Sequence, residues 1–266
     1  GEKREFGQAN KQGVEASAYV GHDWKINSRL TIQYGVRYSH YDYKSLNGEY
    51  YDRIPVPEST ENPSGYVLKI NQTDPNAVVA SYGNWEPRFA LNVTANESSS
   101  LKLSYNRLVQ YIHLMSNTAA STPLDVWTSS TNNIKPQIVD QVALGLFKNF
   151  GPDGNNYESS IEIYYKDMQN QIDYADRANL FLNPYFEKDL LFGKGRAYGI
   201  EFFLKKNVGK LTGWASYTLA RTERKIEGLN NNEWYANRYD RTHTLNLVGQ
   251  YSLSDKWSFG ANFAYI

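Results

Sequence analysis

The chain has 266 residues, with 28 basic and 28 acidic side chains, no cysteine, and a mean hydropathy of −0.63. This balance gives no basic field for a nucleic-acid partner, and the lack of thiols excludes disulfides and cysteine-ligated metals. No apolar run approaches the roughly 18 residues of a membrane helix, but strands that cross a membrane alternate and average out as hydrophilic, so they are not excluded.

Apolar and polar side chains alternate with a period of two in about ten segments. Ile32 and Tyr34 share one parity in the second segment, while Arg37 falls on the other. A strand with one apolar and one polar face separates two different solvents. The alternation is least regular in the eighth segment, where Trp214 falls on the polar parity. In chain order the segments are residues 14–24, 30–39, 85–93, 101–110, 142–146, 158–166, 198–204, 214–217, 244–251 and 257–263.

The connections between these segments alternate between short and long. The short ones are residues 26–29, 95–98, 151–155, 207–210 and 252–255, and the long ones are residues 42–83, 112–135, 167–195 and 222–242. An outer-membrane barrel has tight periplasmic turns on one rim and longer extracellular loops on the other, whereas a soluble sandwich mixes loop lengths. The sequence therefore predicts an all-β, antiparallel, up-and-down transmembrane β-barrel, present as a partial arc of about ten strands of roughly 9 to 14 residues, with negligible helix.

Aromatic side chains follow the same geometry. Five lie beside short turns and four near the ends of long loops, as two girdles at the two membrane interfaces would. The alternative is that they are ordinary core aromatics of a soluble β-domain. The first group is Trp24, Phe150, Tyr157, Tyr251 and Trp257, and the second is Tyr38, Tyr41, Trp85 and Tyr111.

Residues with catalytic or metal-binding chemistry form no recognisable set. The four histidines lack metal-ligand spacing, and His243 is interpreted as a strand-entry residue bonded beside Asp240 and Arg241 rather than as a ligand or proton site. The chain has no Gly-x-Ser-x-Gly turn and no phosphate loop. Glu158 and Glu162 are four apart on one strand, too distant for a glycosidase pair. We predict no catalytic residue, no metal and no cofactor.

The long loops are the better place for recognition, because loops on a rigid scaffold carry most binding residues. Trp127, Trp234 and Tyr235 are loop aromatics among Asn, Thr and Asp residues. Flat rings beside polar donors suit sugar or peptide ligands, and the alternative for each ring is packing within its own loop.

Six stretches resemble the barrel of TonB-dependent outer-membrane receptors, specifically the Bacteroidetes branch in which a plug follows a carboxypeptidase-regulatory-like domain. Their order and spacing are more specific than any one of them, and together they cover most of residues 84–266. They are NWEPRFAL at 84–91, SYNRLVQY at 104–111, STPLDVW at 121–127 with IKPQ at 134–137, YYKDMQNQIDY at 164–174, GRAYGIE at 195–201 and YDRTHTLNL at 239–247.

The resemblance implies a nutrient transporter in the outer membrane, importing a glycan, peptide or metal chelate. Members of the family have a plug inside the barrel, a TonB box before it and about 22 strands. We therefore expect residues 1–266 to be a mid-barrel part without plug or TonB box. The implied partners are outer-membrane lipid, the plug and remaining strands, the TonB complex and a surface lipoprotein.

The polar parity has a plainer role in such a barrel, where the inward face is wet. We expect its charges to face the lumen and to contact water or a plug: Arg37, Arg88, Lys102, Glu158, Glu162, Lys166 and Glu201. The apolar parity should lie exposed on the outer surface, as tested by Leu30, Ile32, Tyr34, Val36, Leu101, Leu103, Ile161, Ile163, Phe202, Leu204, Leu245 and Leu247.

Two other classes of protein stay open. One is a plugless porin or structural barrel, which an upstream plug domain would exclude. The other is a soluble β-rich carbohydrate-binding module, which predicts that the apolar parity points into a core.

Overall fold

The computed structural model of the chain describes residues 11–59, 64–115, 126–152, 156–176, 178, 183 and 185–266, with the side chain of Val126 left out. Within these ranges no helix has both the length and the apolar character to cross a bilayer. The only helical elements described are two short 3-10 turns, η1 (Phe186–Asp189) and η2 (Asn230–Asn232).

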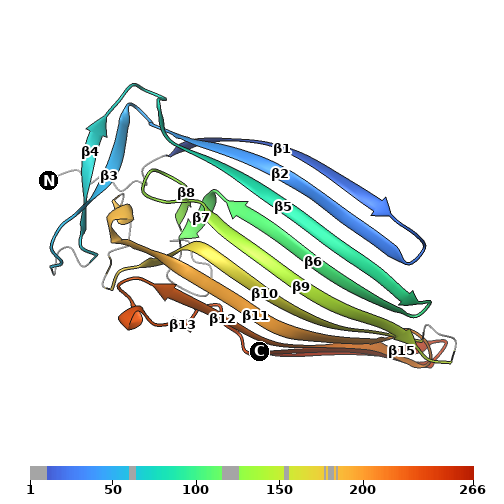
Figure 1. The fold of residues 1–266 in the computed structure, drawn as a ribbon. Helices are drawn as coiled ribbons and strands as arrows, with labels where there is room; N and C mark the ends of the chain where they lie inside the picture. Colours follow the sequence, from blue (N-terminus) through green and yellow to red (C-terminus); the bar gives the residue numbers. More distant parts are fainter. Residues whose placement is uncertain are drawn as a thin grey trace.

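Ten antiparallel strands lie side by side in chain order and form a curved wall (Figure 1). Each pairs with the next strand of the path, as an up-and-down barrel requires, so the predicted fold class and strand number are confirmed. The strands are β1 (Gln12–Lys25), β2 (Leu30–Lys44), β5 (Val78–Asn96), β6 (Ser99–Gln110), β9 (Gln137–Phe150), β10 (Tyr157–Tyr174), β11 (Leu190–Lys206), β12 (Leu211–Ile226), β14 (His243–Ser254) and β15 (Trp257–Tyr265).

Smaller strands form hairpins in the long connections. β3 (Glu49–Pro55) pairs with β4 (Tyr66–Gln72), β7 (Ile112–Met115) pairs with β8 (Val126–Ser129), and β13 (Tyr235–Ala236) adds to the end of β12. These hairpins gather at one end of the wall (Figure 1).

The short turns lie at the opposite end and are closed by residues with turn chemistry (Figure 1). Asn27 Oδ1 accepts hydrogen bonds from the backbone N–H groups of Arg29 and Leu30 at 2.8 and 2.9 Å, which fixes the β1–β2 turn. Gly209 has a φ of 99°, which residues with a Cβ rarely adopt. The predicted turn at Asp153 lies outside the described residues.

The strand register divides the wall into two faces, because opposed residues of antiparallel strands project on the same side. We call the face of Arg37 and Glu162 the polar face and the face of Ile32 and Ile163 the apolar face. None of the twelve side chains predicted to be exposed is buried. Tyr34, Ile161, Ile163, Phe202, Leu204 and Leu247 are exposed, and the other six are partly exposed. The apolar parity therefore does not form a protein core.

Several strands are longer than the predicted upper limit, reaching 18 residues in β10 and 19 in β5. The predicted loop at residues 167–195 is therefore too long, because β10 continues to Tyr174 and β11 begins at Leu190. The physical reason is a β-bulge between Met168 and Gln171, with Asn170 in the left-handed region at a φ of 54°. A bulge shifts the parity of the residues after it. The alternation in the sequence is therefore interrupted at the bulge, although the strand continues beyond it.

The buried side chains gather among the long connections. Tyr41 and Tyr111 stack with ring centroids 5.0 Å apart, and Tyr111 shares a hydrogen bond of 2.8 Å with Ser39. The predicted place of these two tyrosines in a girdle is wrong, because odd-numbered residues of β2 lie on the polar face and both rings are buried against residues of β5 and β6. Tyr38 and Trp85, on the apolar face, do pair there with centroids 4.7 Å apart.

Gly213 and Gly249 are register partners and allow a matched test of the wall. Gly213 has a φ of 148°, and a Cβ there would collide with the Val248 carbonyl oxygen, whereas a Cβ on Gly249 meets nothing within 4 Å. We expect Gly213→Ala to destabilise the full-length protein by about 1–3 kcal/mol and Gly249→Ala to have little effect. The stability of both variants is measured by incubating the receptor in increasing denaturant and following, by electrophoresis, the fraction that still migrates as the folded form. Equal effects of the two variants would contradict this account of the β12–β14 pairing.

Candidate functional site

The polar face collects the charges that the sequence pattern predicted. Opposed pairs such as Asn92–Lys102 and Lys102–Gly145 continue this face from strand to strand. Trp214 also lies on it, opposite Lys205, which accounts for the irregular eighth segment. All seven predicted charges share the polar face: Arg37, Arg88, Lys102, Glu158, Glu162, Lys166 and Glu201.

Two of these charges are neutralised within the wall. Arg37 Nη2 donates to Glu15 Oε1 at 2.9 Å. Glu158 Oε1 accepts a hydrogen bond from Asn207 Nδ2 at 2.6 Å and lies 3.9 Å from Lys205 Nζ. Both therefore offer less charge to any other part of the protein than the sequence suggested.

Glu162 and Glu201 face each other directly across β10 and β11. Among the described residues, no basic side chain forms an ion pair with either of them. With Ser160, Phe203 and Thr218 they line a hollow of about 490 Å³ on the polar face. Like charges opposed in a sheet are destabilising. A cation from outside the wall would relieve this repulsion.

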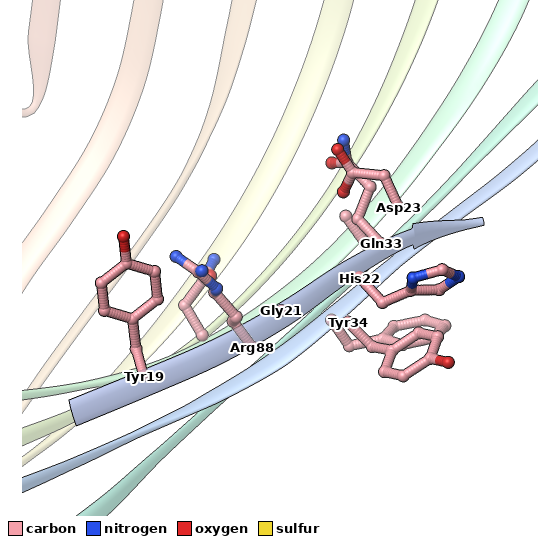
Figure 2. A pocket seen from close by; sticks show the side chains of 10 residues that line it. Tyr19, Gly21, His22, Asp23, Gln33, Tyr34 and Arg88 are labelled. Atoms are coloured by element: carbon pink, nitrogen blue, oxygen red, sulfur yellow. The ribbon is translucent and has the colours of Figure 1, made fainter. Parts of the chain in front are cut away.

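Arg88 lies over a gap in the polar face that two glycines create. Gly21 and Gly35 are register partners, and a Cβ on Gly35 would lie 3.1 Å from Arg88 Nε. The guanidinium sits 5.9 Å from the ring centroid of Tyr19 and lines a hollow of about 520 Å³. In Figure 2, Tyr19 and Arg88 project on the side toward which the other strands curve, and Tyr34 projects on the other side. The polar face is therefore the concave one.

Three long connections are joined to one another by buried polar contacts at the loop end of the wall. Glu187 in η1 forms an ion pair with Lys11 and accepts hydrogen bonds from Thr131 at 3.3 Å and Asn133 at 2.8 Å. Arg53 on β3 donates to a carbonyl at the start of β11 at 2.6 Å. Burial lowers the pKa of the Arg53 guanidinium and raises that of the Asp189 carboxyl. These contacts hold the loops as one cap.

The three loop aromatics proposed for recognition lie in different settings. Trp127 on β8 is 64% exposed. Trp234 packs on Arg196 of the apolar face, with the guanidinium 4.2 Å from the ring centroid. The Tyr235 hydroxyl donates to Asp173 at 2.9 Å, and burial together with this carboxylate raises the pKa of the hydroxyl. Trp127 is the most exposed of the three side chains, whereas Trp234 and Tyr235 hold their loop against β11 and β10.

The residues that join the loops were not found by sequence reasoning. Glu187, Arg53 and Asp173 belong to no periodic pattern, and their partners lie far away in the chain: Arg53 bonds the carbonyl of Leu190, 137 residues on. The sequence showed only that these charged residues lie in long connections, where charged side chains are ordinarily solvated. Only the fold brings these residues together.

No catalytic or metal site emerges from the described part of the chain. His40 Nε2 lies 3.1 Å from Asp42 and 3.3 Å from Ser81, but a nucleophilic triad needs its serine and carboxylate on different ring nitrogens. His243 bonds the Tyr217 hydroxyl at 2.8 Å, not the charged residues that precede it as expected. No group of three or more acidic or histidine side chains suited to a metal occurs in the ranges described.

Comparison with known families decides the identity. The family model described as "TonB dependent receptor-like, beta-barrel" matches residues 4–266. The chain belongs to the TonB-dependent receptor β-barrel family. No curated protein matches it in sequence. Receptors of this family are outer-membrane proteins, so the wall lies in the bacterial outer membrane.

Solved structures show the same fold. The FrpB iron transporter from Neisseria meningitidis (F3-3 variant) aligns with a TM-score of 0.62 at 13% identity, over 97% of this chain and 33% of that one. The ferric-catecholate import receptor Fiu from E. coli K12 aligns at 0.60 and 16%, over 96% and 34%. The copper transporter OprC aligns at 0.59 and 14%, over 95% and 34%. The chain spans about a third of the length of these receptors, and at this identity the likeness concerns the fold alone.

The buried His113 should make the loop end of the wall sensitive to pH. His113 Nε2 bonds Ser130 at 3.0 Å, and burial, with the nearby Lys11 charge, lowers the pKa of the imidazole to about 4. The unfolded loop binds the proton from about pH 6.5 downward, so stability is lost as the pH falls from there toward 4. At pH 5 the β7–β8 hairpin should be about 2 kcal/mol less stable than at pH 7.

Hydrogen exchange at residues 112–115, corrected for intrinsic rates, measures this loss. The variant His113→Gln keeps a neutral polar side chain and should remove most of the pH dependence. An unchanged pH slope in that variant would show that another group is responsible.

Proposed function

We propose that this chain forms part of the wall and the outer mouth of a TonB-dependent active transporter that imports a nutrient. The nutrient binds at the outer side, and energy relayed by TonB to a plug inside the barrel releases it inward. The observation that carries this proposal is the polar face, whose opposed Glu162 and Glu201 have no basic partner in the described wall. A wall of this kind is suited to receive a charged protein part in its lumen.

We extend this proposal to the branch of the family, the partners and the nutrient of the whole receptor. The motifs NWEPRFAL at residues 84–91 and GRAYGIE at 195–201 support the Bacteroidetes branch, with a plug, a TonB complex and a surface lipoprotein as partners. Glycans, peptides and metal chelates are the nutrient classes that we consider. Trp127, which is 64% exposed in a long connection, favours a ligand with flat apolar faces, such as a sugar.

Two alternatives differ from the transporter in what they require. A soluble carbohydrate-binding module needs the apolar parity in a core, and none of the twelve test residues is buried. A plugless porin needs an open lumen and works without TonB. Cells that produce the full-length protein should take up the nutrient only when TonB and the proton gradient are intact. Uptake that continues in cells without TonB would favour the porin.

Conductance tests the lumen without knowledge of the substrate. The full-length protein in a planar bilayer should show almost no steady conductance if a plug fills it. The double variant Glu162→Gln/Glu201→Gln removes the acidic pair that should hold a plug cation, so we expect frequent openings and a several-fold increase in uptake of large antibiotics. Glu158→Gln should have a smaller effect, because Asn207 and Lys205 already hold that carboxylate. A silent double variant would argue against a plug contact at this pair.

The sidedness of the wall gives a further prediction. Each strand crosses the membrane once, so the short turns should be periplasmic and the long connections extracellular. The chain has no cysteine, so Glu58→Cys and Glu233→Cys in loops, and Ser28→Cys and Ser254→Cys in turns, provide single labels in this region. A membrane-impermeant maleimide should label only the loop variants on intact cells. Labelling of the turn variants alone would mean that the barrel is inverted.

A further inference from the structure

A row of charged side chains crosses the apolar face below the loops. Consecutive register pairs join five strands: Arg107–Asp140, Asp140–Asp167, Asp167–Arg196 and Arg196–Glu223. Arg221 joins the row through Glu223 at 3.5 Å. We call these six residues the outer charge row. On the same face of the strands below it, the side chains are apolar or aromatic until the last positions before the turns.

Ion pairs hold most of the row together. Arg107 donates two hydrogen bonds of 2.8 Å to the two oxygens of Asp140. Arg196 Nη2 lies 2.7 Å from Glu223, and Arg221 Nη1 lies 2.8 Å from Asp240. Bidentate and networked pairs of this kind lower the cost of placing charge beside an apolar medium.

The distance from the row to the turns matches a hydrocarbon layer. Asp140, Asp167 and Arg196 each lie ten positions from the turn ends of their strands, at Phe150, Tyr157 and Lys206. Ten residues extend about 33 Å along a strand, and a tilt of about 40° reduces this to about 25 Å, the height of the apolar band of outer-membrane barrels.

Aromatic rings line the edge of the layer. Tyr105, Tyr165 and Tyr198 each precede or follow a row residue by two positions, on the side of the turns. Tyr165 and Tyr198 stack with centroids 6.4 Å apart, and Tyr105 donates to Asp140 at 2.7 Å. Tyrosine is enriched where an apolar layer meets a polar one. Trp234 reaches the same level from its loop by packing on Arg196.

Burial changes at the same level. Ile161, Ile163 and Tyr165, below the row, are 44%, 47% and 49% exposed. Beyond the row on the same face, Ile172 of β10 and Leu190 of β11 are buried. The wall thus leaves its apolar side chains bare up to the row, and loops cover them beyond it.

Two lysines lie just beyond the row on the apolar side of the wall. Lys194 and Lys225 are register partners, both exposed, and no acidic side chain in the described ranges pairs with them. Like charges opposed in a sheet need counter-charge from their surroundings. An anionic headgroup layer supplies it.

We infer that the outer charge row marks the level at which the hydrocarbon of the outer leaflet ends, and that Lys194 and Lys225 face its anionic headgroups. The strand ends beyond the row, with the loop cap, stand outside the membrane as a collar. This inference rests on the membrane location of the receptor and on the sidedness proposed above, and it is independent of what the receptor transports.

Spin-label accessibility tests the level of the boundary. Single cysteines replace Ile163, Tyr165, Lys194, Leu219 and Lys225 in the full-length receptor, reconstituted in lipid vesicles and spin-labelled. The ratio of oxygen to nickel-chelate accessibility should be high at Ile163, Tyr165 and Leu219 and should fall several-fold at Lys194 and Lys225. Ser104→Cys on the polar face is the control and should never reach the ratio of Ile163.

Other outcomes separate the inference from the proposed function. A ratio at Lys194 and Lys225 as high as at Ile163 would overturn the inference, because hydrocarbon would extend past the row. A low ratio at both Tyr165 and Leu219 would overturn it in the other direction. Neither result bears on TonB-dependent uptake, which is measured separately. The comparison of Leu219 with Lys225 on β12 repeats the test made on β10 and β11.

Vesicle composition tests the headgroup contact. The denaturation midpoint of the wild-type receptor should rise when phosphatidylglycerol replaces part of the phosphatidylcholine, and high salt should reduce the rise. The double variant Lys194→Gln/Lys225→Gln should show a smaller rise. An equal rise in the variant would show that the two lysines do not face the headgroups.

Discussion

The pairing of backbone groups between neighbouring strands is the constraint on which the rest of this molecule depends. A strand inside a membrane has no water to satisfy its N–H and C=O groups, so each must bond to the next strand. The bonded register then fixes the side of the wall on which every side chain lies. From Gln12 to Tyr265 the path of ten strands keeps the same two faces, and a shift of one residue in any pair would exchange them.

The two faces meet different surroundings and follow different rules. On the apolar face, Ile161 and Ile163 are exposed without cost because lipid replaces a protein core. On the polar face, charges are tolerated because water or protein reaches them, and Arg88 lies over a glycine pair instead of another side chain. On the five strands from β6 to β12 that carry the outer charge row, the apolar face ends where these charges begin.

The loop end follows the packing rules of a soluble protein, with apolar side chains buried inside it. Its side chains pack around Ile134 and Leu190, both fully buried, and its charges are satisfied by partners from other loops, as at Glu187. This packing gives the loop end a defined shape, so the exposed Trp127 projects from an ordered support. A receptor needs such support, because a ligand bound by a preorganised surface loses less free energy to ordering the loops.

Much of the wall was open to prediction from the sequence alone. A period of two that recurs in segment after segment indicates strands with two different faces, so the strands and the shared face of Arg37, Glu162 and Glu201 followed from parity. Short turns of Asn, Ser and Gly residues gave the strand order, because neighbouring segments joined by tight turns must pair. The resemblance to TonB-dependent receptors came from short sequence motifs and needed no structure.

The tertiary structure decided what periodicity cannot carry. The bulge at Met168–Gln171 ended the alternation without ending β10, and Tyr41 and Tyr111 are not in the expected girdle because they are buried in a cluster with side chains of β5 and β6. The sequence also did not show which charges are already paired within the wall. Arg37 forms an ion pair with Glu15 on the neighbouring strand, whereas Glu162 lies opposite another glutamate. Alternation is a property of one strand, and these features depend on which strands and loops become neighbours. Local sequence therefore fixed the faces, and only the three-dimensional pairing fixed the contacts made on them.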